Sequence, residues 1–341
     1  ELINKTVSIK REQLSNMKAH LYRQILASLR VLETNENIDI QLHEQLDYAR
    51  ILYNKGLYLQ SLKILDRVKE NAKARNQVSF LVEVLFLEKK LESLHITRSM
   101  QDRADALTGE SNETNIQLIR VTRLSNLALQ LYSWYIKNGH ARNSEDEKEV
   151  ENYFNEHLTE DVKNPEGFYE RLYYNQSYCW YAFIRQDYLL YYRYTQKWVD
   201  LFAKDPAMME IETANYIKGL HNLLNAHFTL RNYSGFNKTI QLLESFRDSD
   251  TVKRNNNNEV QVFVYLYIAK ISQHFLEGTF KEGLTIVPEI SQQLKEFSIY
   301  LDHHRVLVFY YKIASLYFGA GDFGTAIDYL NKIINWKVDL R

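Results

Sequence analysis

Apolar residues recur every three or four positions along almost the whole chain, which is the pattern of helices that bury one side. Residues 42–73 contain two such stripes, separated by Gly56. The first stripe consists of Leu42, Leu46, Ala49 and Tyr53, and the second consists of Leu62, Leu65 and Val68. Two helices joined by so short a turn lie antiparallel with their stripes facing each other. The segment is therefore predicted to be a helical hairpin.

The same kind of turn recurs along the chain, and an aromatic residue follows it each time. These aromatic residues are Tyr58, Tyr188, Tyr233, Phe280 and Phe323. The last four are separated by 45, 47 and 43 residues. Two weaker turns, near residues 95–97 and 138–140, fill the longer interval that precedes them. Repetition at such a period predicts an all-α solenoid of about seven antiparallel helix hairpins.

Local signals place the ends of several helices. Ser144 with Glu147 is interpreted as a capping box, and Asn164-Pro165 and Asp205-Pro206 are interpreted as helix starts. Residues 247–259 are predicted to be a polar loop, and Pro288 is expected to kink a helix. Residues 1–341 are predicted to form a single helical-repeat array. In it, 39–341 supply the hairpins and 1–38 hold one leftover helix, at 10–34, of a truncated upstream region.

These hairpins resemble the tetratricopeptide repeat, whose pattern is a small residue, an aromatic three positions on, a glycine-aromatic turn and then alanine. The last hairpin matches through Ala314, Tyr317, Gly321, Phe323 and Ala326. The first matches through Ala49, Gly56, Tyr58 and Ser61. The middle hairpins depart from the pattern, because Tyr191 and Phe236 stand where it has alanine. The resemblance implies a right-handed superhelix, from a bacterium, whose small residues let paired helices approach while the aromatic fills the gap between them.

The resemblance also implies a binding surface, because the first helix of each pair lines the concave side, where family members usually bind proteins or peptides. Counting back from each turn gives the candidate residues of this surface. They are His43, Asp47, Arg50, Tyr173, Gln176, Trp180, Lys218, Asn222, Asn225, Tyr265, Ser272, Tyr311, Lys312 and Ser315. Lys218, Asn222 and Asn225 share one helix face, which suits binding of a peptide backbone or terminal carboxylate. The alternative is that this face is simply the solvated side of an amphipathic helix.

Residues 168–194 hold twelve aromatic side chains in twenty-seven positions. One stripe consists of Tyr174, Tyr178 and Tyr181 and ends at Arg185, and another contains Tyr169, Tyr173 and Trp180. A helix packed on one side needs only one apolar stripe. Tyrosine suits recognition surfaces, so this region is the first candidate for a contact site. The alternative is that neighbouring hairpins cover both stripes.

Composition narrows the classes of function. The chain carries 42 basic and 43 acidic residues, a net charge of −1, which gives no field that attracts nucleic acid. The single cysteine, Cys179, excludes an internal disulfide and lies in an apolar run, where we expect a buried, inert thiol. No stretch is long and apolar enough to span a membrane, and we expect a cytoplasmic protein.

No pattern in the chain indicates catalysis, a cofactor or a metal site. Phosphate-binding loops, nucleophile elbows and kinase signatures are absent from the sequence. Asp302-His303-His304 has metal-ligand chemistry, but adjacent histidines on a helix point about 100° apart. We therefore expect a non-enzymatic scaffold for a protein or peptide. The other hypotheses are a peptide-gated regulator with its effector module upstream and, least favoured, an RNA-binding repeat protein.

Overall fold

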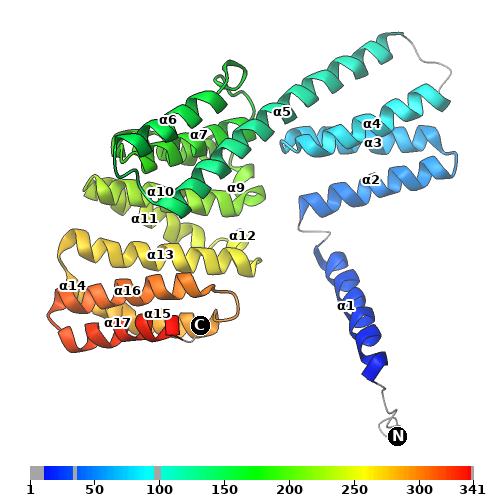
Figure 1. Cartoon of the computed structure of the whole chain (residues 1–341). Coiled ribbons are helices and arrows are strands. Elements are labelled where there is room, and N and C mark those ends of the chain that lie inside the picture. Colours follow the sequence, from blue (N-terminus) through cyan, green and yellow to red (C-terminus); the bar gives the residue numbers. More distant parts are fainter. Residues whose placement is uncertain (1–10, 34–36, 96–100, 339–341) are drawn as a thin grey trace, which may run out of the picture. The chain divides into compact units, whose positions relative to one another are not determined.

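The structure, a computed structural model, describes residues 11–33, 37–95 and 101–338, and these form helices and connecting turns without a strand (Figure 1). The predicted all-α fold is therefore confirmed. The α-helices are α1 (Arg11–Glu33), α2 (Ile38–Asn54), α3 (Tyr58–Ala74), α4 (Val78–His95), α5 (Gln101–Asn138), α6 (Ser144–His157), α7 (Phe168–Ile184), α8 (Tyr188–Lys204), α9 (Ala207–Ile211), α10 (Thr213–Thr229), α11 (Tyr233–Arg247), α12 (Asp250–Lys253), α13 (Asn256–Glu277), α14 (Phe280–Gly283), α15 (Val287–Glu296), α16 (His303–Ala320) and α17 (Phe323–Val338). Short 3-10 turns, η1 (Glu160–Val162) and η2 (Leu284–Ile286), lie between them.

The chain divides into two compact units, Glu1–Leu118 and Ile119–Arg341. In the first unit, α2, α3 and α4 pack side by side around one apolar core. In the second unit, α7 pairs with α8, α10 with α11 and α16 with α17, and apolar cores lie between consecutive pairs. Each pair thus buries its apolar side against its neighbours along the chain, as expected for a helical repeat.

A residue with positive φ marks each turn that was predicted within the described part of the chain. These residues are Gly56, Gly139, Gln186, Arg231, Gly278 and Gly321. At all of these turns except the one at Gly139, the amide after the positive-φ residue donates to the carbonyl five residues earlier, as where Asp322 donates to Tyr317 at 2.9 Å. Asn76 makes the same turn between α3 and α4, where none was predicted. Part of the weak turn predicted at 95–97 lies outside the described residues.

Small residues bring the paired helices together as predicted. Ala49 and Ser61 are fully buried where α2 meets α3, and the Ser61 hydroxyl donates to the Ala49 carbonyl at 2.7 Å. The expected role of the aromatic after the turn is wrong for two hairpins, since Tyr233 and Phe323 are 49% and 56% exposed. The residue three positions later packs inward instead, as buried Phe236 does, because it lies one turn further along the facing side of the helix.

Four local predictions are wrong, of which the last concerns the start of α7 and is described with the other helix ends. The segment 247–259 contains α12 and the start of α13 instead of a loop, because Ser249 caps α12 and Asn255 caps α13. Pro288 lies in the first turn of α15, where a missing N–H costs nothing, and so it starts a helix. Asn143 caps α6 in place of Ser144, its side chain accepting from two backbone amides.

The other predicted ends agree more closely. The predicted helix at 10–34 is α1, and α9 begins at Ala207, directly after the predicted Asp205-Pro206 start. By contrast, α7 begins at Phe168 and not at Asn164-Pro165, because Gly167 stands at its cap position. These ends fix the register of the first helices, α7, α10, α13 and α16, on which the candidate site lies.

Candidate functional site

The first helices of the second unit contact one another through polar and aromatic side chains. The rings of His221 on α10 and Tyr265 on α13 stack with centroids 4.1 Å apart and planes 12° from parallel. The Lys312 ammonium on α16 donates to the Ser272 hydroxyl on α13 at 3.4 Å. The helices α10, α13 and α16 thus present one continuous surface, which we call the first-helix face, and Figure 1 shows them in succession.

Two lysines of this face, Lys218 on α10 and Lys312 on α16, lie on either side of α13 in the order of the helices. The Lys218 ammonium lies 4.8 Å from the ring centroid of Tyr132 on α5 and 5.5 Å from that of Trp180 on α7. Aromatic faces attract a cation at such distances. We call the group formed by Tyr132, Trp180, Lys218, His221, Tyr265 and Lys312 the two-lysine cluster. Neither lysine forms an ion pair anywhere in the described part of the chain.

The surroundings of the cluster disfavour positive charge. Burial lowers the pKa of Lys218 and the pKa of Lys312 below the ordinary value for lysine. Burial, followed by the charges of Lys312 and Lys218, lowers the pKa of His221 to about 4. All three side chains still keep part of their surface accessible to solvent. The cluster is therefore a partly desolvated group of cationic side chains, and a nearby anion would lower the free energy of their charged forms.

The polar groups that link α7 to the start of α10 are already paired with one another. Glu212 accepts hydrogen bonds from the Tyr169 hydroxyl and the Asn215 amide, both at 2.7 Å. The Gln176 amide, which is buried, donates to Asn215 at 3.0 Å. Tyr173 stacks on Tyr169 with ring centroids 6.4 Å apart, and burial raises the pKa of its hydroxyl. These groups satisfy one another and link α7 to α10.

Neighbouring helices cover the stripe of α7 that consists of Tyr174, Tyr178 and Tyr181. Tyr178 stacks on Tyr194 of α8 at 4.1 Å, and Tyr174 contacts both of these rings. Tyr181 stacks on Phe154 of α6 at 4.1 Å. The Arg185 guanidinium lies over the Tyr181 ring and donates to its hydroxyl. This stripe therefore packs between helices and lies away from the two-lysine cluster.

The remaining candidates fall in three places. Asn222 is buried, where its amide accepts from the Tyr191 hydroxyl at 3.0 Å and donates to the Lys218 carbonyl. Asn225 and Tyr311 are exposed on the first-helix face. Ser315 donates to the Tyr311 carbonyl. The predicted residues of the first unit are engaged locally, as follows: His43 contacts Phe80, and Asp47 and Arg50 form ion pairs.

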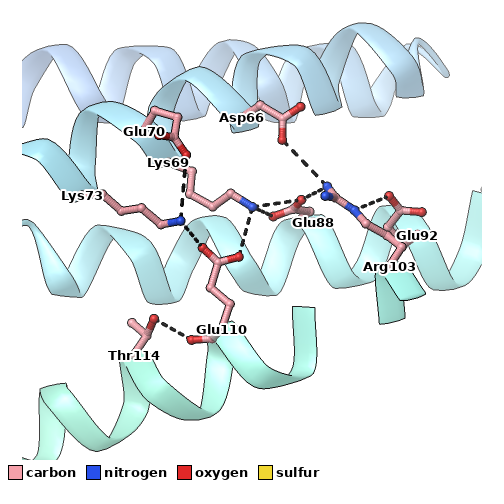
Figure 2. Close-up of polar contacts among 9 residues, drawn as sticks. All are labelled: Asp66, Lys69, Glu70, Lys73, Glu88, Glu92, Arg103, Glu110 and Thr114. Atoms are coloured by element: carbon pink, nitrogen blue, oxygen red, sulfur yellow. Dashed lines mark hydrogen bonds and ion pairs between the residues drawn. The ribbon is translucent and has the colours of Figure 1, made fainter. Parts of the chain in front are cut away.

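The first unit holds a second charged cluster, which is internally paired (Figure 2). Glu88 on α4 is fully buried and binds the Lys69 ammonium at 3.0 Å and the Arg103 guanidinium. Glu110 on α5 pairs with Lys69 at 3.2 Å and Lys73 at 2.7 Å. Every cation in this cluster has a carboxylate partner, so its charges hold three helices together and leave none for a ligand.

Other candidate groups have structural roles. Cys179 is buried, and burial raises the pKa of its thiol well above the ordinary value, as expected for an inert residue. Asp302 caps α16 by accepting from the Arg305 amide at 2.8 Å, and the His303 ring contacts Trp336. Among the described residues, no group of three or more His, Cys, Asp or Glu side chains is placed to hold a metal ion. In the same residues, no helix has the length and apolar character needed to cross a membrane.

Sequence reasoning missed His221 and Tyr132. Gln176 lies ten residues before the positive-φ residue of its hairpin, and the equivalent residue before Arg231 is His221. The predicted set instead took Asn222, which lies nine residues before Arg231. Counting ten residues back from the positive-φ residue in both hairpins would have selected His221. Tyr132 lies on the long helix α5 and does not match any of the intervals used for the candidates.

Comparisons with known proteins leave the family open. No protein-family model matches the chain, and the search of curated proteins gives no match either. The resemblance to tetratricopeptide repeats accordingly rests on the motif residues of the first and last hairpins and on the packing of neighbouring helix pairs.

Proposed function

We propose that this protein is a non-enzymatic scaffold that binds a peptide segment of a partner protein along its first-helix face. The observation that carries the proposal is the two-lysine cluster, in which two partly desolvated cations have no carboxylate partner within the described residues. Desolvated charge without a counterion costs free energy. A bound partner that supplies the counterion offsets this cost, so the cluster favours a binding role.

The dimensions of the face suit an extended peptide. Packed helices lie about 8–10 Å apart, so the path from α10 across α13 to α16 is about 16–20 Å long. An extended chain covers about 3.3 Å per residue, and about five or six residues therefore span the path. Side chains that donate hydrogen bonds and aromatic side chains both line it, which suits recognition of a backbone together with one or two side chains.

We further propose the finer features of the fold, namely seven hairpins wound as a right-handed superhelix of the tetratricopeptide kind, with the first-helix face on its concave side. The recurrence of the positive-φ turn at intervals of 43–47 residues from Gly139 to Gly321 supports a regular array. So do the apolar cores between consecutive pairs in the second unit.

The test is a screen of random peptides displayed on phage against the full chain, followed by fluorescence anisotropy with the recovered peptides. Asn225→Trp places a bulky ring on the exposed part of the first-helix face, and Gln241→Trp places the same ring on exposed α11, the second helix of the same pair. We expect Asn225→Trp to weaken binding tenfold or more and Gln241→Trp to change it less than twofold. Equal affinities of the two variants, or a screen that yields no binder, would contradict the proposal.

A further inference from the structure

We propose that the two-lysine cluster is a carboxylate-recognition subsite, so that the bound segment carries a carboxylate between Lys218 and Lys312. The inference rests on the proposed function and deepens it, because it names the chemistry of the partner. The two lysines come from α10 and α16, with α13 between them. His221, whose ring stacks on that of Tyr265, lies close enough to both ammonium groups for their charges to lower its pKa.

The charges around the cluster do not balance. The nearby Arg305 is already paired with Asp302 at 3.4 Å, and Glu212 already accepts from Tyr169 and Asn215. No carboxylate contributes to the pKa of either lysine. Two positive charges therefore remain uncompensated on the first-helix face, and an anion of matching charge completes the site.

Donor groups remain free at the cluster to bind this anion. An ammonium group has three N–H donors, of which Lys312 uses one on Ser272. The rings beside Lys218 attract its charge and leave its N–H groups free for an acceptor. The His221 ring forms no hydrogen bond within the described part of the chain, and its protonated form adds a further donor.

The arrangement favours a carboxylate over a phosphate. Phosphate sites typically combine a bidentate arginine with backbone amides at a helix N-terminus. The cations here are lysines beyond the first turn of α10 and of α16, and so they do not act together with the free backbone amides of a helix start. Two separated point charges suit one carboxylate each, or one carboxylate shared by both. An acidic side chain and a peptide C-terminus offer the same chemistry, and the test distinguishes them.

The experiment compares three fluorescent versions of a peptide recovered by the screen. The first has glutamate side chains and an amidated C-terminus, the second has glutamine and a free C-terminal carboxylate, and the third has glutamine and an amidated C-terminus. We expect the first or the second to bind at least tenfold tighter than the third. Lys218→Met and Lys312→Met should each abolish this preference, whereas Lys238→Met, at an exposed lysine of α11, should preserve it. Circular dichroism confirms that each variant is folded.

Failure of the subsite is distinguishable from failure of the proposed function. Equal binding of all three peptides would overturn the carboxylate subsite and leave peptide binding intact. A second measurement needs no peptide, since succinate should shift the imidazole NMR signal of His221, assigned with His221→Phe. A succinate shift that Lys218→Met and Lys312→Met remove supports the subsite even if no peptide binds. A shift with inorganic phosphate but none with succinate would refute the carboxylate assignment.

Discussion

The buried ion pairs of the first unit give the sharpest test of the energetics. Glu88 is 0% exposed and balances Lys69 and Arg103, as Figure 2 shows. Glu88→Gln preserves the size of the side chain and removes its charge. Lys69 then has only Glu110, at 3.2 Å, as a counterion. The variant therefore isolates the cost of leaving a buried cation partly uncompensated.

The expected loss of stability in Glu88→Gln depends on the carboxylates that still pair with Lys69 and Arg103. Removing one member of a buried pair costs about 3–5 kcal/mol. The lower end applies here, because Arg103 remains 3.4 Å from Glu92 and its side chain is 40% exposed. A loss of about 3 kcal/mol corresponds to a roughly 100-fold larger population of the locally open state. Glu70 offers the matched control, since its side chain is 75% exposed and lies 3.9 Å from Lys73. Glu70→Gln should cost less than about 0.5 kcal/mol.

Amide hydrogen exchange followed by mass spectrometry measures this effect locally. Peptides from α3 and α4 should exchange roughly 100-fold faster in Glu88→Gln than in the unchanged protein, and peptides from α10 and α13 should exchange at the same rate in both. The four tryptophans all lie in the second unit, so fluorescence gives an independent check that this unit is intact. Equal protection of α3 in Glu88→Gln and Glu70→Gln would refute the reasoning.

Three further predictions concern turns and titration. Gly321→Ala should destabilise the protein by about 1–2 kcal/mol, because residue 321 has a φ of +87° that a side chain disfavours. Gly109→Ala, on an open helix surface, should stabilise it by about 1 kcal/mol, and thermal denaturation measures both changes. Binding should tighten as pH falls from neutral towards about 4, the pKa of His221 in the free protein, because a carboxylate facing the two lysines, Tyr265 and His221 raises that pKa. In His221→Phe this dependence should vanish in anisotropy titrations. Burial raises the pKa of Glu110, but its lysine partners outweigh this and lower it, so urea titrations should show stability lost as pH falls below about 4.5.

The turns were predictable because they depend on a local backbone requirement. Gly56, Gly278 and Gly321 adopt the left-handed conformation that glycine favours, and periodicity on both sides located Gln186 and Arg231, which adopt it at a cost. The turn at Asn76 has neither glycine nor an aromatic two positions later, and its only signal is asparagine, which adopts the left-handed conformation less readily than glycine. Helix starts were less predictable, since several polar residues compete for each cap.

The candidate site was predictable only in part. Lys218, Trp180, Tyr265 and Lys312 follow from the register of the first helices, but no periodicity shows which polar side chain lacks a partner. Asn222 illustrates the limit, because one position of register separates its buried amide from the accessible ring of His221. Which charges are balanced depends on contacts between helices that lie far apart in the sequence.

Desolvated lysines are paired with carboxylates in the first unit and have no such partner in the second, and this contrast is the strongest support for the proposed binding site. Burial alone would lower the pKa of Lys69, but hydrogen bonds and ion pairs with Glu88 and Glu110 raise it above the ordinary value. Burial lowers the pKa of Lys218 and that of Lys312 without a compensating carboxylate. The same chain therefore supplies internal counterions where a buried lysine serves the fold. Where it supplies none, the lysine has no counterion within the described residues, and in our proposal the partner brings the anion.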